Sequence, residues 1–248
     1  MKIALIGFGN MGQEIDAFAK ENNHSIVSIS FRDRNQKLDL EGIRNADVII
    51  DFSSFEIIID NIRQIMQLKK PMVVGTTGWY QDIKKAQKIV KQYNGSLIYG
   101  QNFSVGANIF FSIVSHAASL LGKYEDYDVF GIEIHHSGKK DSPSGTARKL
   151  AEIIMGNFPR KTKLQTNKIE GLIGKNELHF ASVRGGRNFG QHEIVFDSLS
   201  DEIRLTHQAF SRRGFAKGAL LAAEYILSKK GFYNFNDIFI DKLGVRKK

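Results

Sequence analysis

The chain has 248 residues, of which 42% are hydrophobic and 25% charged, and this composition suits a water-soluble protein of two modest domains or one large one. No apolar run approaches the roughly 20 residues that span a bilayer, which excludes an integral membrane protein. Without cysteine there is no disulfide, no thiolate nucleophile and no cysteine-bound metal. The net charge of +9 is scattered along the chain, which is typical of a solvated surface that attracts small anions rather than of a nucleic-acid interface.

The N-terminal sequence contains an apolar run that superficially resembles the core of a signal peptide. The run covers only residues 3–6 and then breaks into glycines, and no small-residue cleavage site follows it. We therefore expect a cytoplasmic protein.

The first hundred residues alternate between short apolar runs and segments of helical period. The apolar runs predict strands at residues 3–6, 26–31, 46–50, 71–75 and 96–99. Helical spacing of apolar residues appears between them, at residues 11–19, 58–66 and 83–90. Continuous apolar strands that alternate with helices are typical of a parallel sheet covered on both faces, with right-handed crossovers.

The pattern changes after Asn102. A longer helix is predicted from apolar residues at helical spacing, namely Ile109, Ile113, Ala117, Leu120 and Leu121. A strictly alternating strand follows, with Phe130, Ile132 and Ile134 on one face and Val129, Gly131, Glu133 and His135 on the other. Further alternating segments, at residues 178–184, 191–198 and 202–209, indicate an open, partly antiparallel sheet with one wet face.

We interpret the chain as an α/β protein of two domains. Residues 1–104 and 213–248 are expected to form a Rossmann-type domain with a parallel sheet, closed by a last helix whose apolar positions are Phe215, Ala219, Ala222, Ala223 and Ile226. Residues 105–212 are expected to form an inserted α+β domain with an open mixed sheet. Within it, residues 157–177 are predicted to be a loop.

The segment GFGNMG at residues 7–12 follows the first predicted strand and opens the first predicted helix. Gly7, Gly9 and Gly12 would permit a tight turn, a close approach to a pyrophosphate and close packing of helix on strand. Asn10 and Met11 begin the helix, whose free N–H groups favour an anion. A purely structural glycine turn is the alternative, but the agreement of strand, motif and helix favours a dinucleotide site.

The end of the second predicted strand bears on which dinucleotide binds. NAD-binding proteins usually place an acidic residue there for the ribose hydroxyls, but this chain has Phe31 or Arg32 at that position. An arginine can pair with a 2′-phosphate, so our hypothesis is that Arg32 helps the chain use NADPH at least as well as NADH. The alternative is a solvated charged turn in which Asp33 pairs locally.

Two loops follow the fourth and fifth predicted strands, where ligands of parallel sheets gather. Their backbone groups and hydroxyls could hold a nicotinamide carboxamide, although the same residues could form generic turns. The candidates are Gly75, Thr76 and Thr77 in the first loop and Asn102, Phe103 and Ser104 in the second.

The segment EIHHSGKKDSPSGTA at residues 133–147 ends in a predicted helix start. Ser142 is expected to be its N-cap and Pro143 its first residue. Free N–H groups at that helix start, together with Gly145 and the Thr146 hydroxyl, would suit a carboxylate.

Two histidines and two lysines lie just upstream in the same segment. His135 and His136 end a strand and point to opposite faces, so they do not favour a tetrahedral metal site, and each alone could be an ordinary core or surface residue. Lys139 and Lys140 add positive charge. Together an imidazole, a cation and an anion-binding helix end indicate proton donation to an anionic substrate, and beside a dinucleotide site they indicate hydride transfer followed by protonation.

Residues 133–147 resemble the E-x-H-H-x-x-K-x-D-A-P-S-G-T-A signature of the dihydrodipicolinate reductase family, which serves the diaminopimelate–lysine pathway of bacteria. The resemblance covers nearly the whole chain. It includes residues 7–12, DFS at 51–53, GTTG at 75–78, NFSVGAN at 102–108, RGG at 184–186, GQH at 190–192, HQAFSR at 207–212 and FAKGA at 215–219. Ser142 and Ile134 each stand where the family usually has alanine.

The resemblance implies a reductase that uses NADPH or NADH, with His135 as general acid and Lys139 holding a substrate carboxylate. It implies that the dicarboxylate substrate contacts His136, Ser144, Gly145 and Thr146. The dinucleotide would lie against Gly7, Gly9, Asn10, Met11, Gly12 and Phe52, with its nicotinamide end near Gly75, Thr76, Thr77, Asn102, Phe103 and Ser104. The family is tetrameric through the sheet of its inserted domain, and no metal, nucleic-acid or membrane partner is implied.

Two other functions share parts of this pattern. Another small-substrate dehydrogenase, acting on aspartate or homoserine, would have the same architecture without needing the H-H-x-x-K cluster. A non-catalytic, dinucleotide-sensing regulator would explain the basic charge, but it would require a helix-turn-helix for which the chain has no spare segment. Turnover of dihydrodipicolinate would exclude the other small-substrate dehydrogenase, and DNA binding without reductase activity would indicate the regulator.

Overall fold

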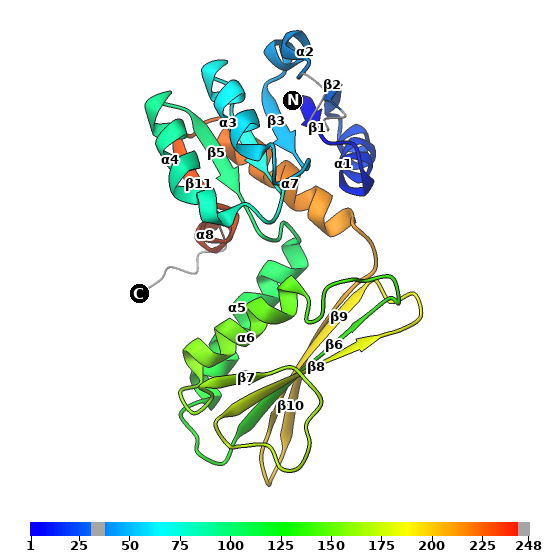
Figure 1. The fold of residues 1–248 in the computed structure, drawn as a ribbon, viewed down its shortest axis with the longest axis vertical. Coiled ribbons are helices and arrows are strands. Elements are labelled where there is room, and N and C mark those ends of the chain that lie inside the picture. The colour runs from blue at the N-terminus through cyan, green and yellow to red at the C-terminus, as the bar shows by residue number, and fades with distance from the viewer. Residues whose placement is uncertain (31–37, 243–248) are drawn as a thin grey trace. The chain divides into compact units, whose positions relative to one another are not determined.

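The computed structural model describes residues 1–30 and 38–242, and the chain falls into two compact units. The first unit combines Met1–Val105 with Arg212–Lys248, and the second comprises Gly106–Ser211. Each unit has its own sheet (Figure 1). Arg32, predicted to select the dinucleotide, lies outside the described residues.

The sheet of the first unit has six parallel strands in the order β11-β5-β4-β3-β1-β2. The strands are β1 (Lys2–Ile6), β2 (Ser25–Ser30), β3 (Val48–Asp51), β4 (Met72–Val74), β5 (Ser96–Tyr99) and β11 (Gly231–Asn234). The chain passes from β1 outward to β2 on one side and to β3 on the other. The carboxyl ends of β1 and β3 therefore flank the switch point at which sheets of this kind bind ligands.

Side-chain alternation along the strands divides the core of this unit into two clusters. Ile3 and Leu5 pack on one face, against α1 (Asn10–Glu21), α7 (Arg213–Ile226) and α8 (Phe235–Lys242). Ala4 and Ile6 pack on the other face, against α2 (Leu40–Asn45), α3 (Ile58–Gln67) and α4 (Ile83–Gln92). Both faces are buried, which explains the continuous apolar runs in the sequence and confirms the predicted Rossmann-type layer order.

The helices α2 and α8, the short helix η1 (Tyr80–Asp82) and the edge strand β11 were not predicted. Helix α2 has six residues and is held at its start by Asp39, whose carboxylate accepts a hydrogen bond of 3.0 Å from the Gly42 N–H. Strand β11 is half-buried along its whole length and pairs only with β5, so it shows neither a continuous apolar run nor an alternation.

The second unit has a five-stranded mixed sheet in the order β10-β9-β6-β8-β7. The alternating segments predicted a partly antiparallel sheet and four of these strands, but not β7 or the strand order. The strands are β6 (Asp128–His135), β7 (Lys163–Gln165), β8 (Glu177–Arg184), β9 (Gly190–Asp197) and β10 (Glu202–Ala209). Strand β6 runs parallel to β8 and antiparallel to β9. Helices α5 (Val105–Leu121) and α6 (Gly145–Asn157) pack side by side on one face of this sheet (Figure 1).

The two faces of β6 differ in a way that the sequence did not reveal. The face with Glu133 and His135 is buried beneath the helices, whereas the apolar face with Phe130, Ile132 and Ile134 is only half-buried. Among the described residues, no helix covers this second face. The uncovered face is therefore apolar along β6 but carries Glu193 and Arg204 on β9 and β10, and the covered face buries ionisable side chains of β6 and β9.

The apolar positions predicted for α5 are only partly correct: Ala117 and Leu121 pack against the core, but the other three are exposed. Ile109, Ile113 and Leu120 are 39%, 47% and 46% exposed, and the buried residues are instead Ala107, Asn108, Phe110, Phe111, Val114 and Ala118. The helix is apolar around most of its circumference. Periodicity alone therefore could not determine which side faces the sheet.

Two further predictions in the second unit are corrected. Residues 157–177 are not entirely a loop, because they contain β7, which pairs in parallel with the start of β8. Helix α6 begins at Gly145 rather than Pro143, and its N-cap is Ser144, whose Oγ accepts a hydrogen bond of 3.1 Å from the Ala147 N–H. Ser142 and Pro143 precede the helix in the loop.

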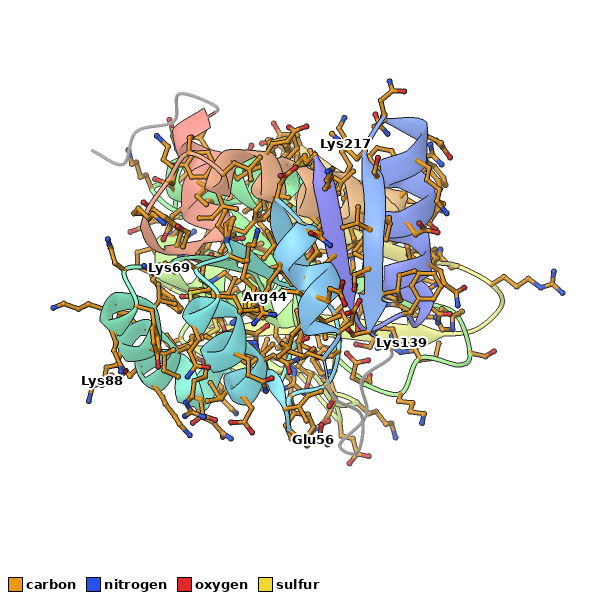
Figure 2. The ribbon with its side chains drawn as sticks, turned by 90° about the horizontal axis from the view of Figure 1, so that it is seen from above. Arg44, Glu56, Lys69, Lys88, Lys139 and Lys217 are labelled. Carbon is orange, nitrogen blue, oxygen red and sulfur yellow. The ribbon has the colours of Figure 1, made fainter. Side chains whose placement is uncertain are left out.

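None of the helices in the described part of the chain has the length and apolar character that crossing a bilayer would require. The basic side chains of the first unit are dispersed. Figure 2 shows Lys69, Lys88 and Lys217 on separate parts of this unit, and they belong to the loop after α3, to α4 and to α7 respectively. This dispersion agrees with a solvated surface rather than a single basic interface.

Candidate active site

The turn after β1 requires glycine at two positions. Gly7 has a φ of +88°, and a Cβ built on it would lie 2.4 Å from the Phe52 carbonyl oxygen. A Cβ on Gly12 would lie 2.3 Å from the Gly7 carbonyl oxygen. Only glycine leaves room for this packing, in which the turn after β3 approaches Gly7 and α1 approaches the turn after β1.

The third glycine of the motif has a different environment. Gly9 is the N-cap residue of α1, and among the described residues no side chain caps the helix and none would lie within 4 Å of a Cβ on Gly9. The first N–H groups of α1, beginning at Asn10, have no acceptor within the helix. This combination of open space and unpaired donors fits a pyrophosphate, because the helix N-terminus carries partial positive charge.

A buried carboxylate organises the loops around this turn. Asp51, at the end of β3, is 0% exposed and accepts hydrogen bonds from the Ser53 N–H and hydroxyl, the Asn61 amide and the Thr76 hydroxyl, at 2.9, 2.6, 2.8 and 3.1 Å. Burial raises the pKa of Asp51. The network ties the loops after β3 and β4 together, and it was not predicted.

The remaining cofactor candidates divide into accessible and buried side chains. Thr77 is exposed, but the Thr76 side chain is buried on Asp51, and Phe103 is 2% exposed within the core. Asn102 accepts a hydrogen bond of 2.8 Å from the Ser104 N–H, and a Cβ on Gly75 would overlap the Phe52 ring. Phe103 and Thr76 can therefore contact a dinucleotide only through their backbone.

The Gly7 geometry makes a testable prediction. Gly7→Ala should weaken the binding of NADPH and NADH at least tenfold, because the methyl group forces the turn away from Phe52 and a non-glycine residue at positive φ costs about 1–2 kcal/mol. Isothermal titration of each dinucleotide measures the effect. Gly171→Ala is the matched control, because Gly171 has a φ of +91° in the other unit with nothing near its Cβ. Unchanged affinity in Gly7→Ala would contradict this prediction.

In the second unit, strand register places polar residues in one row across four strands. Ser182 of β8 is opposite Glu133 of β6, Glu133 is opposite His192 of β9, and His192 is opposite His207 of β10. The row lies on the face covered by the helices. Burial lowers the pKa of His207, whose ring stacks on Phe110.

Glu133 is the charged centre of this row and is 0% exposed. Its Oε1 accepts hydrogen bonds from the Ser144 N–H at 2.9 Å, the Ser182 hydroxyl at 2.7 Å and the Arg184 guanidinium at 2.8 Å. Burial alone would raise the pKa of Glu133, but its interactions with His192, Ser144, Arg184 and Ser182 outweigh burial and hold that pKa far below its usual value. Glu133 is therefore ionised at neutral pH.

His135, two residues along β6, shares this buried face. Its Nδ1 lies 3.4 Å from Glu133 Oε2, and its ring meets that of His192 edge-on with centroids 5.2 Å apart. Burial lowers the pKa of His135 to about 4; the charge of Glu133 opposes this shift, while His192, Lys139 and Arg184 add to it. In the free chain the imidazole is therefore neutral at pH 7.

The loop between β6 and α6 carries the other predicted substrate ligands. Lys139 Nζ lies 2.6 Å from Asp141 Oδ1, with its side chain 24% exposed, and the Arg184 guanidinium also donates to the Asp141 carbonyl at 2.7 Å. His136 is half-buried, and its N–H donates to the Asn188 carbonyl. The helix start has an exposed Gly145 and a half-buried Thr146, whereas Ser144 is 2% exposed and contacts His192 at 3.2 Å.

Sequence reasoning missed the convergence of Glu133, His192 and Arg184 on His135. Glu133, His135 and His192 each offer one atom that could bind a metal ion, and these three atoms lie within 4.8 Å of one another. Arg184 already neutralises Glu133, which disfavours a divalent cation at the same carboxylate. The cluster is therefore better described as a buried group of ionisable side chains than as a metal site. The two-residue spacing of Glu133 and His135 on a strand showed in the sequence that both side chains share a face. The register of β6 with β8 and β9, which brings in Arg184 and His192, could not be read from the sequence.

These features define a class of protein: a reductase or dehydrogenase with a Rossmann-type unit and a second unit that carries an ionisable site. Comparison with known proteins specifies the class further. Residues 1–103 match the family model for the N-terminus of dihydrodipicolinate reductase, and residues 106–239 match the model for its C-terminus. The chain belongs to the dihydrodipicolinate reductase family.

Individual relatives agree with this assignment. The chain is 38% identical to the 4-hydroxy-tetrahydrodipicolinate reductase of Christiangramia forsetii, with 97% of this chain and 98% of the relative covered. It is 35% identical to the enzyme of the same name from Staphylococcus carnosus, with 96% and 99% covered. Its fold resembles that of a dipicolinate-bound dihydrodipicolinate reductase from Paenisporosarcina sp. TG-14, with a TM-score of 0.79, 24% identity and 96% and 99% of the two chains covered.

Proposed function

We propose that this chain catalyses the reduction of 4-hydroxy-tetrahydrodipicolinate by NADPH or NADH, in the diaminopimelate and lysine pathway. The observation that carries the proposal is the buried Glu133–His135–His192 cluster beside the lysine loop, in a chain whose other unit has an open glycine turn for a pyrophosphate. Relatives with this name are 32–38% identical over nearly the whole chain. The cytoplasm is the expected compartment.

The substrate class follows from the charges in the second unit. A cyclic imine with two carboxylates would be held by Lys139 and His136 and by the N–H groups at the start of α6, near Gly145 and Thr146. A solved relative binds dipicolinate, a planar dicarboxylate of the same kind. The Ser144 hydroxyl already caps α6, so Ser144 would support the substrate site by fixing where the helix begins.

The residues also support an order of chemical events. Loss of the 4-hydroxyl group as water would give the conjugated imine. The ring carbon conjugated with that imine would then accept a hydride from NADPH or NADH, which leaves an enamine-like anion on the substrate. His135 then gives its proton to the neighbouring carbon, which completes the reduction and leaves the imidazole neutral. The two substrate carboxylates would favour the protonated ring, because a nearby negative charge raises an imidazole pKa.

The direct test follows nicotinamide absorbance with freshly generated substrate and compares NADPH with NADH. We expect turnover with both cofactors, and the ratio of their kcat/KM values tests whether NADPH is used at least as well as NADH. Turnover of aspartate or homoserine, but not of the cyclic imine, would favour the rival dehydrogenase. A folded chain that binds dinucleotide and DNA but reduces nothing would favour the regulator.

We further propose a homotetramer assembled through the uncovered face of the second sheet. Phe130, Ile132 and Ile134 line that face, and the register places Ala181 opposite Ile132 and Val183 opposite Ile134. Val183 is 49% exposed. An exposed apolar patch such as this one on β6 and β8 is typical of protein–protein contacts, and polar residues such as Glu193 border it on β9.

Light scattering after size exclusion tests the assembly. The wild-type chain should have four times the 27.9 kDa mass of one chain, and Val183→Glu should have a smaller mass, because the new carboxylates would be buried without partners. Leu199→Glu is the control, since Leu199 is fully exposed in the turn between β9 and β10. A monomeric wild type, or a tetrameric Val183→Glu, would contradict the proposal.

A further inference from the structure

The carboxylate of Glu133 has two oxygens with different surroundings. Oε1 is fully engaged by donors from the Ser144 backbone, Ser182 and Arg184. Oε2 accepts no hydrogen bond and lies 3.4 Å from His135 Nδ1 and 3.5 Å from His192 Nε2. Three fixed donors on Oε1 hold the carboxylate so that Oε2 points at the two imidazoles.

The His135 ring presents its Nδ1 to Glu133 and its Nε2 to Gly190. Its Nδ1 is buried without a hydrogen-bond partner and faces Glu133. Its Nε2 lies against Gly190, where an added Cβ would come within 3.1 Å. Of the two ring nitrogens, Nδ1 is therefore the one that an N–H can direct at a carboxylate, and Nε2 is the one left for a substrate.

We propose that Glu133 is the positioning residue of the proton donor: its Oε2, 3.4 Å from His135 Nδ1, attracts the ring proton to that nitrogen, so that Nε2 is the nitrogen that delivers the proton to the substrate. This inference rests on the proposed function for the role of His135 in turnover, but the orientation of the ring is a property of the free chain. Carboxylates that orient an imidazole in this way select its tautomer and stabilise its protonated form.

Other charged groups also face this ring, and they act in known directions. Lys139 from the loop, Arg184 from β8 and His192 from β9 each disfavour the protonated form of His135. Glu133 is the one neighbouring charge that favours it. Removing the charge of Glu133 therefore leaves the imidazolium opposed by all three remaining groups.

Glu133→Gln is the sharpest variant because the environment fixes how glutamine must bind. The amide oxygen should take the place of Oε1 among its three donors, which leaves the amide NH₂ pointing at His135. His135 Nδ1 then becomes an acceptor, and the neutral tautomer changes from Nδ1–H to Nε2–H. We expect kcat at neutral pH to fall at least tenfold, and its decline with rising pH to begin at a lower pH than in the wild type.

Long-range ¹⁵N–¹H NMR of the imidazoles measures the tautomer and the titration of His135 directly, without turnover. The wild type should show Nδ1–H, and Glu133→Gln should show Nε2–H with a lower pKa; Glu133→Asp, which keeps the charge, should retain Nδ1–H. Glu152→Gln, an exposed carboxylate on α6, is the matched control and should change neither measurement. Circular dichroism establishes that each variant is folded.

The outcomes separate this inference from the proposed function. A wild-type chain with Nε2–H on His135 overturns the inference even if Glu133→Gln fails to fold. A folded Glu133→Gln with an unchanged tautomer and pKa also overturns it. If the wild type shows Nδ1–H and the glutamine variant reverses it, while the wild type reduces no cyclic imine, the positioning holds and the proposed function fails.

Discussion

Replacing His135 by glutamine should lower kcat roughly 100-fold or more, the range expected for loss of a general acid. Glutamine is similar in size and polar, but its amide does not ionise, so the protonation step loses its donor. The KM for the cyclic imine should change little, because the carboxylates are held by other groups. Steady-state nicotinamide absorbance measures both constants, and His116→Gln, on the exposed side of α5, is the control.

The pH dependence of the His135 variant provides a second readout. Burial lowers the pKa of His135 to about 4 in the free chain, and an acid catalyst is active only while protonated. The kcat/KM of the wild type should therefore fall as pH rises above this value, and kcat should fall at a higher pH, since the bound dianion raises the pKa. Both declines should be absent in His135→Gln. An unchanged turnover number would exclude His135 from proton transfer.

The first unit could be predicted well because its signals are local. Strands such as β1 and β3 are buried on both faces, so their apolar runs stand out, and the glycine motif lies directly between a strand and a helix. Asp51 could not be predicted as a network centre. Its role depends on Asn61 and Thr76, which reach it only through tertiary packing.

In the second unit the sequence identified the catalytic candidates but not their surroundings. The alternation of β6 correctly placed Glu133 and His135 on one face and separated His135 from His136. That this face is the buried one follows from how α5 packs, and α5 is too uniformly apolar for its orientation to be predicted. His192 and Arg184 reach Glu133 through pairing of β6 with β9 and β8, which no local pattern encodes.

The predicted helix start after the lysine loop shows the same limit on a smaller scale. Ser142 and Pro143 match the residue preferences for an N-cap and first helical position, yet Ser144 performs the cap. The Ser144 N–H also donates to Glu133, so the residue that caps the helix is the one that also binds the buried carboxylate. Because both positions are serine, N-cap preference alone does not distinguish them.

Replacing Lys139 by alanine should raise the KM for the cyclic imine roughly 100-fold, with a smaller effect on kcat. Hydrogen bonds to charged groups contribute about 1.5–3 kcal/mol, which corresponds to factors of about 10 to 150 in affinity. In the free chain the Lys139 ammonium pairs with Asp141 near the surface, and both side chains are partly exposed, so a substrate carboxylate can replace Asp141 as its partner. Binding of dipicolinate, measured by calorimetry, should weaken in parallel, while dinucleotide affinity should not change.

Lys140→Ala is the matched control for this prediction, because Lys140 is the adjacent residue, carries the same charge and is exposed. If general electrostatic attraction by the basic loop were responsible, both variants would lose affinity equally, and added salt would abolish the difference from wild type. A specific contact predicts that only Lys139→Ala loses dicarboxylate affinity and that the loss persists at high ionic strength. Loss of kcat with unchanged KM in Lys139→Ala would instead place the lysine in the chemical step.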